Sequence, residues 1–317
     1  MGDRRVWRAA PGTLVAVAGF VVVAAVPVLL LAYSIWRDSR GWVTPALLAG
    51  LSVLALGYAW RFGLHPRLLA DDAGVTVVNP FSTHRFGWDD LRVIAPGENG
   101  MLLASQQASA EAWCVQKSTL AARKGRQTRA DRITNDLCDL LEQHEPPLED
   151  EQTGLRIRRA RPDESPVLTR LERAASESEL AHLFPPERYP YPVPEVTRRW
   201  RRLLRDPQVR VVVLEKDDEP VGFVAFDAST IRHLCVVPDH TRRGYGSALM
   251  EFATAEIFDD GAAGASLWVL EGNPGARAFY ASLGWTGTRD RRDCAFPPAP
   301  PELRLERVNV AAPRRGR

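Results

Sequence analysis

Two apolar stretches without a charged residue dominate the first sixty positions of the chain. A helix crosses the hydrocarbon core of a bilayer with about 20 residues. The pattern therefore predicts two membrane-spanning helices, over 13–33 and 42–60, which form a hairpin within 1–62. Two alternatives stay open, a signal peptide for the first stretch and a buried helix of a water-exposed domain for the second.

Arginine residues flank the two stretches and predict an orientation. Arg4, Arg5 and Arg8 precede the first stretch, and Arg61 and Arg67 follow the second. Because basic residues accumulate on the cytoplasmic side of membrane helices, both ends of the hairpin are expected there. The predicted localisation is the cell membrane, as a multi-pass protein with two spans and cytoplasmic soluble domains. Membrane lipid is an expected partner.

Apolar and polar residues alternate after the hairpin, between turn signals, which predicts a meander of short strands. A polar helix is expected over 118–143. The segments "ADDAGVTVVN" and "FGWDDLRVI" resemble the small bacterial pleckstrin-homology-like (PH-like) domains, which implies a β-rich domain with a C-terminal helix over 63–144. The acidic, proline-containing stretch 145–154 predicts a linker.

Strand and helix patterns alternate from Leu155 onward, which predicts an α/β layered fold. The stretch "VRVVVLEKDDEPVGFVAFD" predicts a hairpin that turns at Asp217–Pro220. "IRHLCVV" and "ASLWVL" are two further strand patterns, and a helix pattern follows each of them.

Composition narrows the function classes. A chain of 317 residues suggests two or three domains. The 41 Lys and Arg residues nearly balance the 39 Asp and Glu residues, so no overall field favours nucleic acid, which we do not expect as a partner. The four cysteines lie far apart without a C-x-x-C pair, so neither a metal site nor a disulfide framework is predicted.

The stretch "HTRRGYGSALM" (240–250) joins a predicted strand to a predicted helix. Gly244 and Gly246 lack a Cβ atom, which lets a ligand approach the main chain. The first N–H groups of a helix form an anion site, and Arg242 and Arg243 add positive charge beside it. A phosphate group, most simply a pyrophosphate, fits this site. The dinucleotide-binding fingerprint is excluded, because no third glycine follows at the required spacing.

A second motif, "EGNPGARAFYASLGW", gives the turn its context. Together the two motifs resemble those of the GNAT acetyltransferase superfamily, over about 155–308. The family's Gln/Arg-x-x-Gly-x-Gly/Ala pattern corresponds to Thr241–Gly246. Its later pattern corresponds to Asn273, Ala276, Phe279, Tyr280, Gly284 and Trp285. The resemblance implies an α/β GNAT fold with a mixed, splayed central sheet and flanking helices.

The resemblance also implies acetyl-CoA as the cofactor and assigns roles to residues. Tyr280 would be the catalytic acid that protonates the leaving thiolate, and Asn273 would bind the pantetheine arm. The main chain of the splayed strand would contact the pantetheine and the thioester through Leu234, Cys235 and Val236. The N–H groups around the pyrophosphate would come from Arg242, Arg243, Gly244, Tyr245, Gly246 and Ser247.

Two departures from the family pattern matter. Thr241 stands where the family has Gln or Arg. Trp268 stands on the strand where some members carry a glutamate base. The general base that deprotonates the amine is not assigned: the candidates are water relays from Glu187, Asp227 or His233. Glu271 lies near the motif as well, but it is equally well explained as an acid exposed on the surface. Cys235 is expected to be an apolar filler instead of a nucleophile.

The expected activity is a membrane-anchored, acetyl-CoA-dependent N-acetyltransferase, in which an amine acceptor attacks the thioester directly in a ternary complex. The acceptor is either a small molecule or a protein N-terminus. Tyr189 and Tyr191 are candidates to stack on it. A basic helix pattern follows them, and its charge is a solvated face by default, with an acidic group or the bilayer as the alternative partners: Arg198, Arg199, Arg201 and Arg202. The alternative function is a non-catalytic, membrane-tethered acyl-CoA-binding sensor or interaction protein. The segment 309–317 is expected to be a basic tail.

Overall fold

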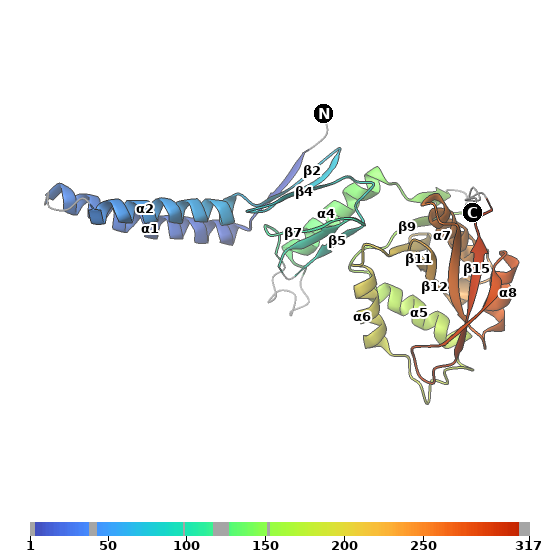
Figure 1. The fold of residues 1–317 in the computed structure, drawn as a ribbon. Helices are drawn as coiled ribbons and strands as arrows, with labels where there is room; N and C mark the ends of the chain where they lie inside the picture. The colour runs from blue at the N-terminus through green and yellow to red at the C-terminus, as the bar shows by residue number, and fades with distance from the viewer. Residues whose placement is uncertain (1–3, 38–42, 98, 117–126, 151–152, 311–317) are drawn as a thin grey trace. The chain divides into compact units, whose positions relative to one another are not determined.

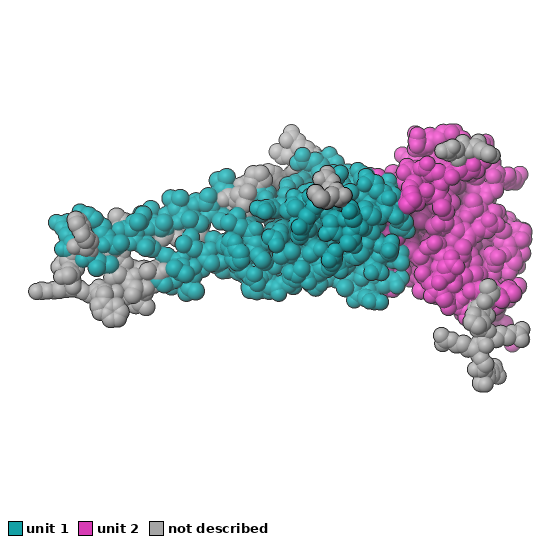
Figure 2. Space-filling model, turned by 90° about the horizontal axis from the view of Figure 1, so that it is seen from above, with its two compact units in different colours: residues 1–145 teal, residues 146–317 magenta. Residues whose placement is uncertain are grey.

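The chain divides into two compact units, residues 1–145 and 146–317, which Figure 2 shows in different colours. The computed structural model describes residues 4–37, 43–97, 99–116, 127–150 and 153–310. Most of the predicted basic tail and the first part of the predicted polar helix, 118–126, lie outside these residues.

Unit 1 begins with a short strand and two long helices, α1 (Pro11–Arg37) and α2 (Val43–Ala59), which lie side by side (Figure 1). The end of α2 continues into a π-helical turn, Trp60–Leu64. Gly63 in this turn is buried, and a Cβ atom there would collide with the side chain of Val17 on α1. The close approach of the two segments therefore requires glycine.

The prediction of two membrane spans is wrong. Across the described parts of the chain, no helix has both the length and the apolar composition that crossing a membrane requires. α2, for instance, has 17 residues, fewer than the roughly 20 that a span takes. The predicted localisation as a multi-pass protein of the cell membrane is wrong for the same reason, and the expectation of membrane lipid as a partner loses its basis.

The rest of unit 1 is rich in β-structure, as predicted. Strands β1 to β4 form one antiparallel sheet and β5 to β7 form a second. The strands are β1 Arg5–Arg8, β2 Arg67–Asp71, β3 Gly74–Val78, β4 Thr83–Phe86, β5 Val93–Pro96, β6 Met101–Ala104 and β7 Ser109–Ala112. The final helix, α4 (Arg129–His144), begins at a capping box between Thr128 and Asp131.

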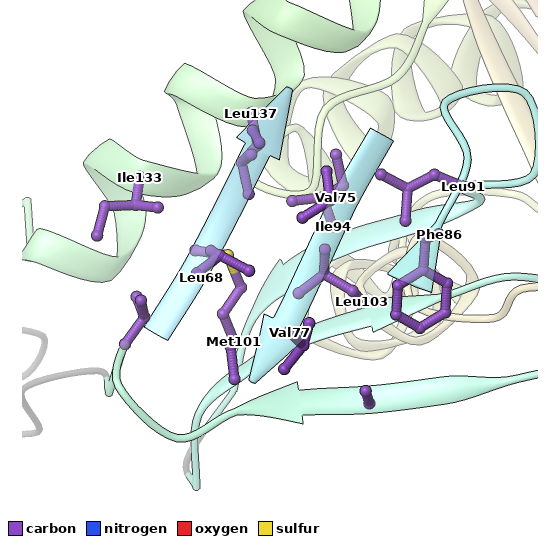
Figure 3. Packing of buried hydrophobic residues seen from close by; sticks show 14 of the residues in the cluster. Leu68, Val75, Val77, Phe86, Leu91, Ile94, Met101, Leu103, Ile133 and Leu137 are labelled. Carbon is purple, nitrogen blue, oxygen red and sulfur yellow. The ribbon is translucent and has the colours of Figure 1, made fainter. Parts of the chain in front are cut away.

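Figure 3 shows the packing of buried hydrophobic residues in the core of unit 1. α4 directs Ile133 and Leu137 toward the strands, where Leu68 and Met101 are fully buried. Apolar residues on one face of the helix and on alternate positions of the strands therefore account for the unit, as the sequence pattern indicated.

Unit 2 is built on one mixed sheet of eight strands in the order β14-β15-β13-β12-β11-β10-β9-β8. All neighbours are antiparallel except β12 and β13, which are parallel. The strands are β8 Leu148–Asp150, β9 Leu155–Arg159, β10 Arg210–Lys216, β11 Glu219–Phe226, β12 Thr230–Val236, β13 Gly264–Leu270, β14 Thr286–Asp293 and β15 Pro301–Val308. The helices are α5 Ser165–Glu179, α6 Val193–Leu203, α7 Tyr245–Asp259 and α8 Pro274–Ser282, with a 3-10 turn at Pro238–His240.

Helices cover both faces of this sheet (Figure 1). α7 and α8 pack on one face, where Leu249 and Ile257 of α7 are fully buried. α5 and α6 pack on the other face, where Trp200 of α6 is fully buried against Phe223 and Cys235 of the sheet. We call these the α7 face and the α5 face. The expected mixed sheet with flanking helices is therefore confirmed.

Local features agree with the sequence pattern at one end of the sheet and differ at the other. The predicted hairpin is present as β10 and β11, and its turn residues Asp217 and Asp218 have φ values of 52° and 65°, which suit a tight hairpin turn. Strand β8, however, lies inside the predicted linker and pairs with β9. An ion pair between Glu149 and Arg156 at 2.9 Å accompanies this pairing.

Candidate functional site

Strands β12 and β13 separate in the middle of the sheet. Their Cα pairing is limited to Thr230 with Ser266 and Ile231 with Leu267. β12 nevertheless stays paired with β11 up to Val236, and β13 stays paired with β15 along its whole length. A gap between the two strands therefore opens beyond Ile231, and their facing backbone groups have no strand partner there. The predicted splay of the sheet is this gap.

The backbone of β12 turns alternate residues toward the gap. Val237 donates its N–H to the Val221 carbonyl of β11 at 2.9 Å. Because N–H and C=O directions alternate along a strand, the peptide groups of Val236 and Leu234 point toward the gap. Those of Cys235 point toward β11, where its carbonyl closely approaches Gly222. Of the three strand residues predicted to contact the cofactor, two therefore present main-chain groups to the gap.

The turn before α7 leaves the helix start uncovered. Gly244 is the N-cap with φ 85°, and no side chain caps the helix. Arg242 also has a positive φ, of 59°. The first N–H groups of a helix have no acceptor within it, and for those of Tyr245 to Ser247 the described residues supply none from elsewhere. Apart from Gly244 and the two residues next to it in the chain, no described residue has an atom within 4 Å of the position that a Cβ of Gly244 would take. The turn is an open set of donors at the positive end of a helix dipole.

The other residues of this turn determine its conformation and what it can offer to a ligand. Thr241 donates its hydroxyl to the Pro238 carbonyl at 2.9 Å, so the residue that departs from the family pattern stabilises the turn locally. Gly246 lies where a Cβ would come within 3.3 Å of the Phe279 ring. Tyr245 is buried and stacks on His240, so it can offer a ligand only its main chain.

α8 carries the second predicted motif. Asn273 is its N-cap, and the Asn273 Oδ1 atom accepts the Ala276 N–H at 3.0 Å. The amide Nδ2 of Asn273 is the donor that this capping bond leaves available to a ligand. Tyr280 is half-buried, and its ring lies 6.5 Å from that of Trp285. Burial raises the pKa of Tyr280 to about 12, so the phenol stays protonated near neutral pH and can supply a proton.

The carboxylates considered as the base are largely engaged elsewhere. Asp227 accepts the N–H groups of Ser229 and Thr230, and it binds Arg232 at 2.8 Å. It therefore organises the turn that precedes β12. Glu271 accepts a hydrogen bond from Arg291 at 2.6 Å, which favours its interpretation as a surface acid. Glu187 is exposed, and its role stays a prediction.

His233 of β12 lies on the α5 face, with its ring 5.1 Å from that of Trp200. It is half-buried, and its ring has no hydrogen-bond partner in the described part of the chain. Burial, assisted by the positive charge of Arg199, lowers the pKa of His233 to about 4. The imidazole is therefore neutral at neutral pH.

The sequence did not reveal a polar cluster under α6. Glu172 of α5 accepts hydrogen bonds from Arg199 and from the indole of Trp200, both at 2.7 Å. Tyr191 lies beside it with a buried hydroxyl, and burial followed by the charge of Glu172 raises the pKa of this phenol. Arg199 thus turns inward, unlike the exposed Arg201 and Arg202. The pairing joins residues 27 positions apart, so no local pattern announces it.

His233 should make the stability of unit 2 depend on pH. Its pKa is about 4 in the folded chain and about 6.5 when unfolded, so the unfolded chain binds more protons between these values. Stability should therefore fall as the pH drops from 6.5 toward 4, by on the order of 3 kcal/mol. Urea unfolding of the wild type and of His233→Gln at pH 7 and pH 5 tests this. An equal loss in both chains would contradict the assignment.

Comparison with known proteins connects these features to a family. The model of the acetyltransferase (GNAT) family matches residues 175–285, and that of the bacterial PH domain matches 65–111. An uncharacterized N-acetyltransferase of Archaeoglobus fulgidus is 35% identical over 99 residues, which are 28% of this chain and 67% of that protein. The ribosomal protein bS18-alanine N-acetyltransferase of Escherichia coli is 37% identical over 70 residues, or 22% of this chain and 47% of that protein.

Two solved structures are also similar. The crystal structure of the ribosomal-protein-S18-alanine N-acetyltransferase from Escherichia coli has a TM-score of 0.40 and 19% identity, and covers 51% of this chain and 99% of its own. An N-acetyltransferase from Thermoplasma acidophilum in complex with coenzyme A has a TM-score of 0.39 and 15% identity, and covers 49% of this chain and 99% of its own. The chain spans about half the length of the Escherichia coli enzyme that it matches in sequence.

Proposed function

The chain belongs to the GNAT acetyltransferase family, an acetyl-CoA-using family of N-acetyltransferases, and from this premise we propose that unit 2 binds acetyl-CoA in the gap between β12 and β13. In this proposal the acetyl group passes directly to an amine acceptor, either a small molecule or a protein N-terminus. The parting of the two strands beyond Ile231 is the observation that carries the proposal.

The residues around the gap fit the cofactor. The N–H groups of Tyr245, Gly246 and Ser247 suit the two negatively charged phosphates of coenzyme A, because the helix start offers donors and a positive dipole end. Exposed Arg242 and Arg243 add charge beside them. A Cβ on Gly246 would press on Phe279, so this position of the turn favours glycine.

The chemistry follows from the groups that face the gap. Acetyl-CoA, when bound, supplies a thioester that an amine can attack. A main-chain N–H of Leu234 or Val236 can donate to a carbonyl oxygen in the gap and stabilise the charge that develops on it. The Nδ2 amide of Asn273 is available to the pantetheine arm. Tyr280 can give its proton to the leaving thiolate, and the phenolate that results can take up the proton that the amine nitrogen loses as the amide bond forms, so that the protons balance; such general acids contribute roughly 10²–10⁴ in rate.

Direct transfer is favoured because the cysteine near the gap is unsuited to carry an acetyl group. Cys235 is 5% exposed, and burial holds the pKa of its thiol far above its ordinary value. The thiolate is the nucleophilic form of cysteine. The turnover of Cys235→Ala with acetyl-CoA should therefore stay within about threefold of the wild-type value. The variant should be slightly less stable, because a buried sulfur atom is removed. Loss of all turnover in this variant, with acetyl-CoA binding intact, would instead indicate an acetyl-cysteine intermediate.

A charge at the start of α7 tests the proposed binding site. Ser247 is the third residue of the helix, where a carboxylate stabilises a helix by about 0.5 kcal/mol. Ser247→Asp should therefore leave the protein folded and slightly more stable. The same carboxylate repels a bound phosphate, so calorimetric titration should show coenzyme A binding at least 10-fold weaker than in the wild type, which corresponds to about 1.4 kcal/mol.

Ser247→Asn is the matched control, because it has a similar size and no charge. Its affinity for coenzyme A should stay within about threefold of the wild type, a difference of less than 1 kcal/mol. Equal affinities in the Asp and Asn variants would show that the phosphates bind elsewhere.

A further inference from the structure

Two side chains flank the gap on the α5 face. His233 belongs to this face because its ring contacts Trp200. Along β13, Leu267 and Val269 are buried on the α7 face, so Trp268 between them points to the α5 face. Both His233 and Trp268 are half-buried, whereas Cys235 on the same face is buried. An acceptor that reaches the gap from this face therefore meets the imidazole and the indole first.

Three ion pairs surround this position. Three guanidinium groups lower the pKa of His233 after burial, and Glu172 of α5 opposes them. They come from α6, from β12 itself and from β14: Arg199, Arg232 and Arg292. The group from β14 also lies over the ring of Trp268, with its central carbon 4.3 Å from the ring centre.

The carboxylates beside these groups are committed to them. Each guanidinium has a partner within hydrogen-bonding distance, and the three partners are Glu172, Asp227 and Glu302. Glu172 also binds the indole of Trp200, and Asp227 also binds two backbone N–H groups. Each of the three is already paired with a guanidinium, which weakens its attraction for an incoming ammonium ion and lowers its tendency to accept a proton.

We infer that the α5 side of the gap receives its acceptor as a neutral amine and therefore selects α-amino groups, such as those of peptide N-termini, over the ε-amino groups of lysine. This inference rests on the proposed function. An ammonium ion placed beside His233 would meet the same desolvation as an imidazolium ion, which disfavours the charged form, and each nearby carboxylate is already paired with a guanidinium.

The selection follows from the ordinary acidities of the two amines. An α-ammonium group has a pKa of about 7.7–8.0 and a lysine side chain about 10.4. At pH 7 the neutral fraction of the α-amine is on the order of 10²-fold larger. The site should therefore acetylate α-amines on the order of 10²-fold faster at equal concentration, and the advantage should shrink as the pH rises toward 9.

Two peptide mixtures test this with the full-length chain and acetyl-CoA. The first has each of the nineteen residues other than lysine at a free N-terminus, and it contains no lysine. The second has blocked N-termini and one internal lysine. Mass spectrometry at pH 7 and pH 9 should show acetylation of the first mixture, with the stated preference and pH trend. Equal or faster acetylation of the lysine mixture, or acetylation of neither, would overturn the inference.

Variants of His233 link the preference to this position. His233→Glu introduces a carboxylate that stabilises an ammonium ion, so the preference for α-amines should fall at least 10-fold. His233→Gln keeps the position uncharged and should leave the preference unchanged. A ratio that is the same in the wild type and in both folded variants would overturn the inference.

A measurement without turnover separates this inference from the proposed function. In the full-length wild type, the histidine ring signal that is absent from His233→Gln should titrate by NMR with a pKa below 5. A titration near 6.5 would overturn the inference even if coenzyme A binds. Absence of coenzyme A binding, by contrast, would reject the proposed function whatever His233 does.

Discussion

Replacing Tyr280 by phenylalanine should lower kcat for acetyl transfer by about 10²–10⁴-fold, the usual contribution of a positioned general acid. The variant removes one oxygen atom from a half-buried ring that packs near Phe279 and Trp285. The affinity for acetyl-CoA should therefore change little. Stopped-flow or steady-state release of coenzyme A, together with calorimetric binding, measures the two effects separately.

Tyr58→Phe in unit 1 is the control, since Tyr58 is an exposed residue of α2, and its kcat should equal that of the wild type. An unchanged kcat in Tyr280→Phe would remove the phenol from the mechanism. If acetyl-CoA bound but no amine were acetylated by either chain, the alternative of a non-catalytic acyl-CoA sensor would gain support.

The second large effect is expected at a buried ion-pair network beneath the edge of the sheet. Arg158 of β9 binds Glu215 of β10 at 2.6 Å and Glu164 at 2.7 Å, and the side chains of all three are at most 13% exposed. Arg158→Met leaves these two carboxylates facing each other without their main counterion. Unpaired buried charges of this kind cost about 3–5 kcal/mol, so urea unfolding should show a loss of that size in unit 2.

The matched control breaks a surface pair by the same substitution. Arg173 and Glu177 lie one turn apart on α5, and their side chains are 53% and 41% exposed. Arg173→Met should cost about 0.5 kcal/mol or less. If the two variants were destabilised equally, the network around Arg158 would not be the structural element that we describe.

The sequence predicted unit 2 well because its signals are local. Alternating strand and helix patterns predicted most elements, and the stretch Asp217–Pro220 predicted the turn of the β10–β11 hairpin. Both predicted cofactor motifs lie where helices begin, and Gly244 adopts the left-handed conformation that glycine accepts most readily. Capping and turn residues carry such information over only a few positions.

Features that depend on distant residues were predicted poorly. Arg199 was grouped with the cations of an exposed helix face, yet it pairs with Glu172 of another helix. The apolar stretches before residue 62 predicted membrane spans, but that hydropathy pattern did not yield a spanning helix in the described residues. The direction of the Cys235 peptide groups depends on the pairing of β12 with β11, which no single stretch of sequence contains.

The central claim is that the start of α7 binds the phosphates of coenzyme A. The most direct test is an amide ¹H–¹⁵N titration of the full-length chain with coenzyme A, with pantetheine as a ligand that lacks the phosphates. The account predicts that coenzyme A shifts the amide signals of residues 242–247 at saturating concentrations and that pantetheine leaves them in place. Signals from this turn that stay unchanged while coenzyme A binds, or that pantetheine moves equally, would contradict it.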